Sequence, residues 1–255
     1  MRVFLTGATS GLGEALARHY AARGATLGLF ARREGELQRL ARELAPAVVA
    51  TYAGDVRDAA ALSHAAADFL GRFGVPDIVI GNAGVSRGTL TQLAEDIPAF
   101  RAVIETNLLG LVHTFQPFLQ PMLDAGHGTL AGIASVAGLR GIPGSGAYSA
   151  SKAGAIAYLE SLRVELRSSG VAVVTICPGY IATPLTAKNP YRMPFLMTPA
   201  KAARLTGRAI AQRRRFYVLP WPMALVGWGL RRLPRWLFDI AFANTKRKPR
   251  QPGVG

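Results

Sequence analysis

The chain has 255 residues, half of them hydrophobic, and a formal net charge of +15 at pH 7. This length and hydrophobic content suffice for a single α/β domain with a full core, and they exclude an intrinsically disordered chain. The single cysteine, Cys177, excludes an internal disulfide and favours a reducing, cytoplasmic compartment. No conventional transmembrane helix or N-terminal targeting peptide is expected, because no long uncharged apolar run occurs and a strand starts at residue 2.

The chain opens with a pattern typical of a phosphate-binding turn. Residues 2–5 predict a short buried strand, residues 6–13 read Thr-Gly-Ala-Thr-Ser-Gly-Leu-Gly, and residues 14–23 predict a helix. Gly7 permits the tight turn, while Gly11 and Gly13 let the backbone approach a pyrophosphate at the positive end of the helix. A plain glycine-rich turn between a strand and a helix is the alternative interpretation.

Strand-like and helix-like segments then alternate, which is the pattern of a doubly wound, Rossmann-like parallel sheet. Further strands are expected at residues 26–30, 48–52, 78–81, 128–133, 171–176 and 216–219, with helices such as 34–44 and 59–73 between them. Ligands bind such sheets outside the carboxyl ends of the strands. The residues expected to meet there are Gly7, Arg32, Asp55, Asn82, Ser135 and Pro178.

Tyr148 and Lys152 lie four residues apart in Tyr-Ser-Ala-Ser-Lys, so a helix would project both from one face. A cation about 4 Å from a phenol, at an effective dielectric constant of about 20, is worth roughly 4 kcal/mol. Such a neighbour can lower the tyrosine pKa by up to about three units, into the range useful for proton transfer. The pair also occurs by chance on many helices, so its weight depends on the rest of the chain.

Together these motifs resemble the short-chain dehydrogenase/reductase family. The resemblance rests on the glycine turn, Asn82-Ala83-Gly84, Asn107, Ser135, Tyr148 with Lys152, and Pro178-Gly179, and it covers residues 1 to about 215. It implies a nicotinamide cofactor and a catalytic site of Ser135, Tyr148, Lys152 and Asn107. The cofactor-binding residues that it implies, together with the candidates discussed next, are Gly7, Thr9, Ser10, Gly11, Leu12, Gly13, Arg32, Arg33, Asp55, Val56, Asn82, Ala83, Gly84, Tyr148, Lys152, Pro178, Gly179, Ile181 and Thr183.

The end of the second strand bears on the choice of cofactor. An acid there would bind a ribose hydroxyl and repel a 2′-phosphate, but this strand ends in Arg32-Arg33. Because arginine can bind a phosphate with two hydrogen bonds, NADP(H) is favoured. Both arginines could instead be solvated surface charges in an enzyme that also uses NAD(H). By resemblance Asp55 and Val56 flank the adenine, although Asp55 or Asp58 could equally cap the following helix.

The resemblance also implies a mechanism. Hydride passes between the nicotinamide and a carbonyl carbon while Tyr148 donates a proton to the oxygen, which Ser135 positions. Lys152 holds the ribose and lowers the tyrosine pKa, and Asn107 anchors a water that resupplies the proton. No residues show the clustering of metal ligands.

The favoured function is therefore an NADP-dependent, reversible reduction of a carbonyl to an alcohol. An apolar flap at about residues 184–200 predicts a lipophilic substrate. The alternatives are an NAD-linked alcohol dehydrogenase and a non-catalytic cofactor-binding scaffold or regulator. The family resemblance and the apolar helix faces at residues 107–116 and 149–166 predict a homodimer or homotetramer.

The cofactor-binding domain is expected to span residues 1–219, with an apolar and basic segment at residues 220–255. Residues 166–255 hold 16 basic residues and one acid, Asp239, together with all three tryptophans. Two short helices are expected at residues 222–233 and 234–243, followed by a disordered basic tail. The segment could associate with the inner membrane surface, cover the substrate pocket or form a subunit contact, or bind nucleic acid. Nucleic-acid binding is the least favoured, because no such motif occurs.

Overall fold

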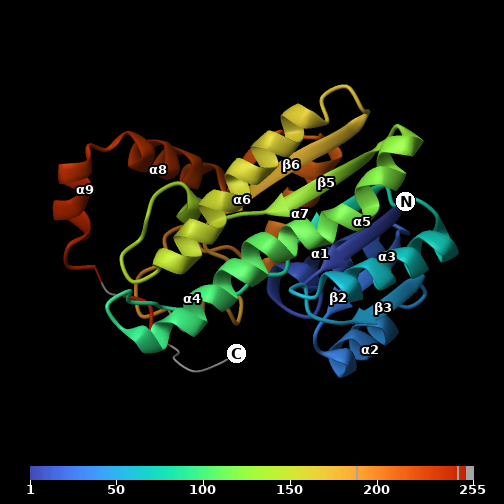
Figure 1. The fold of residues 1–255 in the computed structure, drawn as a ribbon, viewed down its shortest axis with the longest axis horizontal. Coiled ribbons are helices and arrows are strands. Elements are labelled where there is room, and N and C mark those ends of the chain that lie inside the picture. Colours follow the sequence, from blue (N-terminus) through green and yellow to red (C-terminus); the bar gives the residue numbers. More distant parts are fainter. Residues whose placement is uncertain (188, 246, 251–255) are drawn as a thin grey trace.

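The computed structural model describes residues 1–187, 189–245 and 247–250, and a seven-stranded parallel sheet forms its centre (Figure 1). The strands lie in the order β3-β2-β1-β4-β5-β6-β7, so the chain reverses its winding direction between β1 and β4. Their bounds are β1 Arg2–Thr6, β2 Thr26–Ala31, β3 Val49–Ala53, β4 Ile78–Gly81, β5 Gly128–Ile133, β6 Val171–Pro178 and β7 Phe216–Leu219. The predicted α/β fold and the predicted strands are confirmed to within a residue or two at each end.

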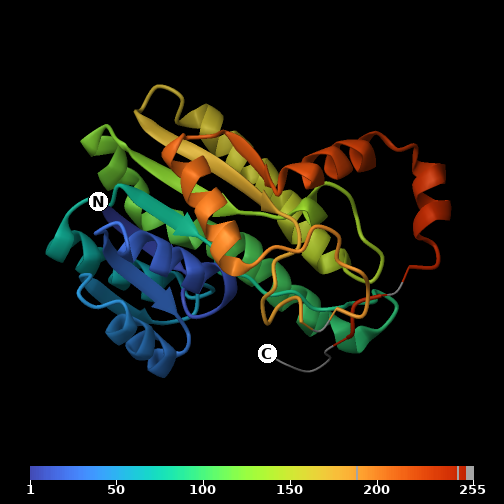
Figure 2. The same ribbon diagram turned by 180° about the vertical axis from the view of Figure 1, so that it is seen from behind.

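Helices cover both faces of the sheet, which explains why its central strands are hydrophobic throughout. One face carries α1 Gly11–Ala21, α2 Glu34–Glu43 and α7 Pro199–Ala211 (Figure 2). The other carries α3 Ala59–Phe73, α4 Ile97–Ile104, α5 Gly110–Ala125 and α6 Gly146–Glu165 (Figure 1). Two hydrophobic clusters result, one on each side of the sheet.

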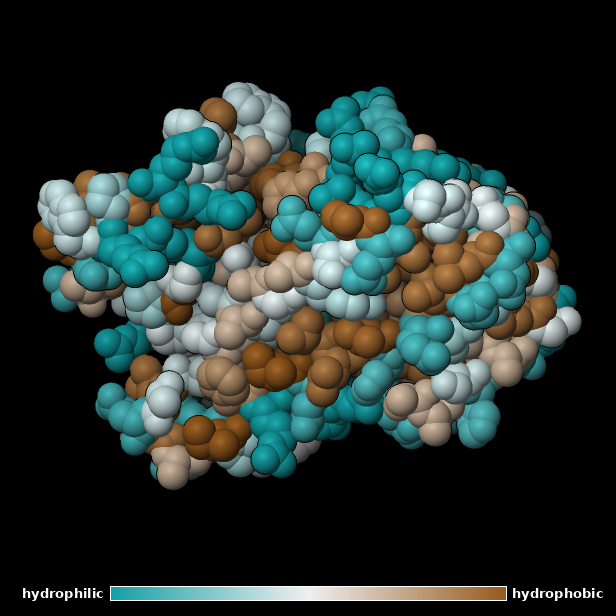
Figure 3. Space-filling model, turned by 45° about the horizontal axis from the view of Figure 1, so that its top comes forward, coloured by the Kyte–Doolittle hydropathy of each residue, from teal (hydrophilic) through white to brown (hydrophobic). Residues whose placement is uncertain are grey.

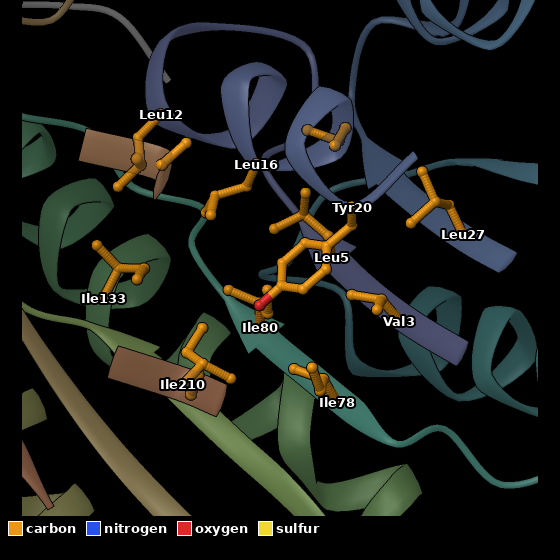
Figure 4. Close-up of a cluster of buried hydrophobic side chains, with 14 of the residues drawn as sticks. Val3, Leu5, Leu12, Leu16, Tyr20, Leu27, Ile78, Ile80, Ile133 and Ile210 are labelled. Carbon is orange, nitrogen blue, oxygen red and sulfur yellow. The ribbon is translucent and has the colours of Figure 1, made fainter. Parts of the chain in front are cut away.

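The cluster beneath α1 fixes the helix that follows the glycine turn (Figure 4). Leu16 and Tyr20, four residues apart on α1, are both buried against β1 and β4. The Tyr20 hydroxyl is enclosed in this cluster without a hydrogen-bond partner among the described residues. Burial accordingly raises the pKa of Tyr20. This packing holds the amino end of α1 at the carboxyl end of β1, where the turn lies.

After α7 the chain forms β7, α8 Trp221–Arg232 and α9 Arg235–Phe242. The two helices project from the end of the sheet, and the chain then returns toward the loop before α4 (Figures 1 and 2). Their inner side packs on the loop at residues 139–140. A side chain at Gly227 would meet Leu139, and the Arg140 guanidinium lies 4.5 Å above the centre of the Phe238 ring. Within the described ranges, no helix is long and apolar enough to cross a bilayer.

The basic tail differs from the expectation of disorder. Residues 247–250 lie against the body of the protein, and Arg250 pairs with Gly88 in a short parallel bridge. The Arg250 guanidinium also forms ion pairs with Glu95 and Asp96. The acidic partners of Arg250 lie more than 150 residues away in the sequence. The charge composition of the tail therefore could not reveal them and predicted a solvated tail. Residues 246 and 251–255, which also belong to the predicted tail, lie outside the described residues.

Candidate active site

The glycine turn between β1 and α1 forms one wall of a cleft at the carboxyl end of the sheet. A Cβ atom on Gly13 would lie 2.0 Å from the Gly7 carbonyl oxygen, and one on Gly7 would lie 2.7 Å from the Ala83 Cα. The Asn82 amide donates to the carbonyl oxygens of Thr6 and Gly7 at 3.0 and 3.2 Å. Asn82 therefore braces the turn from the next strand, and only glycine fits at these two positions.

Helix α1 begins at Gly11, three residues earlier than predicted, so Gly11, Leu12 and Gly13 lie in its first turn. The Ser10 side chain, at the N-cap position, makes no capping hydrogen bond to the helix. The first N–H groups of a helix have no partner within it and carry its partial positive charge. Thr183 closes the cleft from the other side, because a Cβ atom on Gly11 would lie 2.9 Å from its methyl group.

The two arginines after β2 have different environments. The Arg33 guanidinium donates to the Thr9 carbonyl oxygen at 3.0 Å and to the Thr9 hydroxyl at 3.1 Å, so it is tied to the glycine turn. The Arg32 side chain is 62% exposed, and its guanidinium lies 3.9 Å from the Asp55 carboxylate. Arg32 is therefore the freer of the two cations at this end of the cleft.

Asp55 and Val56 follow β3 at the same end. Burial alone would raise the pKa of Asp55, but hydrogen bonds from Arg57 and the charge of Arg32 hold it below the ordinary value. Asp55 is not a helix cap. The cap of α3 is Asp58, whose carboxylate accepts from the Ala60 and Ala61 N–H groups at 2.9 and 3.1 Å.

Ser135, Tyr148 and Lys152 converge at the end of the cleft beside β5, away from β2 and β3. Ser135 follows β5, while Tyr148 and Lys152 lie on α6 as the four-residue spacing predicted. The Lys152 ammonium donates to the Ile133 carbonyl oxygen at 2.7 Å and lies 6.0 Å from the centre of the Tyr148 ring. Cys177, on neighbouring β6, is buried, and burial raises the pKa of its thiol to about 12. A nucleophilic thiolate is thereby excluded.

The expected depression of the tyrosine pKa is not found in this structure. Burial raises the pKa of Tyr148, and its hydrogen bond to Ser135 opposes that rise. Burial lowers the pKa of Lys152 to about 8. The sequence argument assumed an ammonium about 4 Å from the phenol, but the Lys152 ammonium is directed at the Ile133 carbonyl oxygen. Desolvation is therefore the largest effect on both pKa values.

Asn107 lies in a five-residue π-helical segment, η2 Glu105–Leu109, which replaces the regular helix expected there. Its side chain is buried and clamps the backbone of Val85, with Oδ1 accepting from the N–H at 2.8 Å and Nδ2 donating to the carbonyl at 2.9 Å. Nδ2 also donates to the Ser151 hydroxyl at 3.0 Å. In this structure Asn107 positions the loop after β4, and Gly84 packs between it and Lys152.

These residues line a continuous cleft of about 590 Å³. Every predicted cofactor-binding or catalytic residue lines it except Asn107, which lies behind the wall. The loop after β6 forms one side, where the Gly179 N–H donates to the Leu219 carbonyl oxygen and Ile181 pairs with Met197. The lining residues that lie outside both the predicted site and the predicted flap include Ser86, Thr106, Lys248 and Pro249. Lys248 and Pro249 come from the tail, which no local motif connects to the cleft.

The comparisons with known proteins agree with this geometry. The family model for short chain dehydrogenases matches residues 1–193. The chain belongs to the short-chain dehydrogenase family. An uncharacterized oxidoreductase of Myxococcus xanthus is 38% identical to this short-chain dehydrogenase over 239 residues, which cover 93% of this chain and 94% of that protein. Dehydrogenase/reductase SDR family member 7B of Bos taurus is 34% identical over 98% of this chain and 82% of that protein.

Solved structures show the same fold as this short-chain dehydrogenase. An alcohol dehydrogenase from Thermococcus sibiricus complexed with 5-hydroxy-NADP is 28% identical, with a TM-score of 0.76 over 86% of this chain and 95% of that one. An actinorhodin polyketide ketoreductase with NADPH is 27% identical, with a TM-score of 0.78 over 91% and 97%. The predicted family is confirmed, and the chain is an NAD(P)-dependent dehydrogenase or reductase.

The cleft fits a nicotinamide dinucleotide. Side chains at Gly7 and Gly13 would collide with neighbouring backbone atoms, so the two glycines leave the backbone of the turn exposed to the cleft. The first turn of α1 has no side-chain cap, and its N–H groups can bind a diphosphate. Lys152 and Ser135 lie at the opposite end, where the reactive ring and substrate would meet. No group of three or more potential metal ligands occurs among the described residues.

Proposed function

We propose that this short-chain dehydrogenase uses NADP(H) to reduce a carbonyl group on a lipophilic substrate, reversibly, to an alcohol. The observation that carries the proposal is the convergence of Ser135, Tyr148 and Lys152 in the cleft that the glycine turn opens. A bound nicotinamide supplies the hydride. The protein supplies a proton, orientation and electrostatic stabilisation.

Tyr148 is the proton donor in this proposal. Its raised pKa keeps the phenol protonated at neutral pH, which suits the reducing direction. Ser135, hydrogen-bonded to the phenol, orients the substrate oxygen beside it. Lys152 stabilises the negative charge that forms on the phenol as the proton leaves, and its own pKa of about 8 leaves it mostly protonated at neutral pH.

A panel of ketones, aldehydes and 3-oxoacyl thioesters, followed through NADPH oxidation at 340 nm, tests the reaction class. Turnover of at least one lipophilic carbonyl compound is expected. The absence of NADPH oxidation across the panel, with NADPH bound, would favour the non-catalytic scaffold.

NADP(H) is favoured over NAD(H) by the two arginines after β2. Arg32 is exposed at the adenine end of the cleft, and its only ion-pair partner among the described residues is Asp55, at the long distance of 3.9 Å. A 2′-phosphate there could form charge-assisted hydrogen bonds with Arg32. Replacing Arg32 with Ser is expected to raise the KM for NADPH about tenfold or more and leave the KM for NADH nearly unchanged. Equal effects on both cofactors would support the NAD-linked alternative.

The apolar flap supports a lipophilic substrate. Leu185, Phe195 and Leu196 are exposed large hydrophobic residues of this segment. Tyr191 of the flap packs with Tyr180, with ring centroids 6.4 Å apart, and burial raises its pKa to about 12. Pro184 and Leu185 of the flap line the same cleft as Tyr148. In the substrate panel, kcat/KM is expected to rise with alkyl chain length.

We further propose that α8 and α9 contact the surface of an anionic membrane. The large hydrophobic residues on their outer side are 60% to 71% exposed, namely Trp221, Leu225 and Trp228 on α8 and Trp236 and Ile240 on α9. The basic residues beside them are Arg231 and Arg232 in the last turn of α8 and Arg235 at the start of α9. The Arg232 guanidinium lies 4.2 Å above the centre of the Trp228 ring. Hydrophobic and hydrophilic residues alternate closely at this end of the molecule (Figure 3). Tryptophan and arginine together suit the interface of an anionic bilayer.

Co-sedimentation of the full chain with vesicles tests this contact. Binding is expected to vesicles that contain phosphatidylserine and to fall sharply when Trp228 and Trp236 are both replaced by Ser. A Val48→Ser variant, altered at an exposed hydrophobic residue just before β3 and away from α8 and α9, serves as the control. Equal recovery with neutral and anionic vesicles, or unchanged binding of the tryptophan variant, would refute the membrane contact.

We also propose a homodimer or homotetramer built on α5 and α6. Hydrophobic residues stay exposed beside these helices, with Leu109 46% and Val164 60% accessible. Brown surface crosses the middle of the face that α5 and α6 cover in Figure 1 (Figure 3). Light scattering after size-exclusion chromatography should give a mass of two or four chains. A monomer at micromolar concentration would contradict the assembly.

A further inference from the structure

The C-terminal tail is threaded between two loops at the mouth of the cleft. The Gly88 N–H donates to the Pro249 carbonyl oxygen at 3.2 Å, and a Cβ atom on Gly88 would lie 2.3 Å from the Lys248 carbonyl oxygen. On the other side, a Cβ atom on Gly144 would lie 2.8 Å from Cβ of Arg247. Glycine at both positions allows the tail to pass. Gly144 precedes helix α6, so the tail rests on the loop that leads to Tyr148.

Arg250 anchors the tail to a buried carboxylate. Its Nε and Nη2 atoms donate to the two Asp96 oxygens at 2.9 and 3.0 Å, and Nη2 also donates to Glu95 at 2.7 Å. The Asp96 side chain is only 2% exposed, and it also accepts from the Leu90 N–H. The Arg250 guanidinium accordingly lowers the pKa of Asp96. A buried carboxylate with a two-point arginine partner is a strong attachment, because removing either group leaves the other unpaired.

This anchor places the Lys248 side chain across the cleft. Its ammonium donates to the Ser86 hydroxyl at 2.8 Å on one wall and lies 3.4 Å from the Leu185 carbonyl oxygen on the other. Both partners are neutral, and no carboxylate of the described residues pairs with it. Burial lowers the pKa of Lys248 to about 8. A partly desolvated cation that faces a binding cleft without a counter-ion favours an anionic ligand.

We propose that Lys248 is a specificity-determining residue that binds the carboxylate or phosphate head of an amphipathic substrate. Val85, Pro184 and Leu185 line the same cleft and supply apolar surface for the rest of such a molecule. The proposal rests on the proposed function, and it narrows the substrate class from a lipophilic carbonyl compound to one that also bears an acidic group. Ser86 lies two residues after Gly84, which packs against Lys152, so the head group would lie at the catalytic end of the cleft.

Binding of decanoate and decanamide to the full chain, measured by calorimetry with and without NADPH, tests the proposal. The wild-type protein is expected to bind decanoate about tenfold or more tightly than decanamide. Lys248→Met should remove this preference, and Lys248→Arg should retain part of it. Arg250→Ala should weaken the preference because it releases the tail. Lys201→Met, at an exposed lysine in the first turn of α7, is the matched control and should change nothing.

Two outcomes would overturn the proposal. One is a wild-type protein that binds neither compound or binds both equally. The other is a preference for decanoate that survives Lys248→Met; if that variant also binds NADPH more weakly, the ammonium serves the cofactor's diphosphate. NADPH oxidation in the carbonyl panel tests the proposed function without decanoate, so a failure of that function and a failure of this proposal are distinguishable.

Discussion

Burial of the Lys152 ammonium should make the stability of the protein depend on pH in a defined window. The residue is 4% exposed, and burial lowers its pKa from 10.5 to about 8. In the unfolded chain the amine keeps a pKa of about 10.4. Between these two values the unfolded state holds a proton that the folded state has lost, so stability rises with pH from about 8 to about 10.5.

The magnitude follows from the size of the shift. One pKa unit corresponds to about 1.4 kcal/mol, so a buried Lys152 ammonium destabilises the folded state by about 3 kcal/mol below pH 8. Replacing Lys152 with Met removes the charge and keeps most of the stem. The variant also loses the hydrogen bond to the Ile133 carbonyl oxygen, but that loss does not depend on pH. The free energy of unfolding of the wild type, relative to the variant, should therefore increase by about 3 kcal/mol between pH 7.5 and 10.5.

Urea unfolding of both proteins at several pH values in this range measures the difference. Lys248 also has a lowered pKa, but it is present in both proteins and cancels. The Lys201→Met control makes the same substitution at an exposed lysine and reports what the change of side chain does by itself. A constant difference for Lys152→Met would refute the reasoning, because it would mean that the ammonium is solvated in the folded protein.

Three further predictions concern the packing around the cleft. Replacing Tyr20 with Phe removes a buried hydroxyl that lacks a protein partner, and the free energy of unfolding should rise by about 1 kcal/mol in urea titration. A drop of similar size would mean that the hydroxyl is hydrogen-bonded. Replacing Gly13 with Ala places a methyl 2.0 Å from the Gly7 carbonyl oxygen, so NADPH binding by fluorescence should weaken about tenfold or more, and unchanged affinity would contradict the role of the turn. Replacing Asp58 with Ala removes the cap of α3 and should lower stability by about 1 kcal/mol, whereas a neutral effect would place the cap elsewhere.

Much of the fold could be predicted from the sequence because its signals are local. The hydrophobic strands and the glycine turn each act within a few residues, and the structure has these elements with nearly the predicted bounds. The meeting of Gly7, Asn82 and Ser135 could also be predicted, because parallel strands place their carboxyl ends at one edge of the sheet. The grouping of Ser135 with Tyr148 and Lys152 was expected from the family resemblance.

The electrostatics of the site could not be predicted in the same way. The spacing of Tyr148 and Lys152 fixes the helix face but not the direction of the ammonium, which depends on the Ile133 carbonyl of a distant strand. The clamp of Asn107 on Val85 likewise arises from a π-helical segment that no sequence motif indicated. The Arg250–Asp96 pair joins residues 154 positions apart, and only the three-dimensional structure brings the tail to the cleft.

The Tyr148→Phe variant tests the central claim most directly. NADPH oxidation is measured with the best carbonyl substrate of the panel, and NADPH affinity is measured in parallel by fluorescence. The proposed role of the phenol predicts that kcat falls by at least about 100-fold while the Kd for NADPH changes little, because phenylalanine keeps the ring that lines the cleft and loses only the hydroxyl that transfers the proton. Turnover near the wild-type rate, with NADPH bound, would contradict the assignment of Tyr148 as the proton donor.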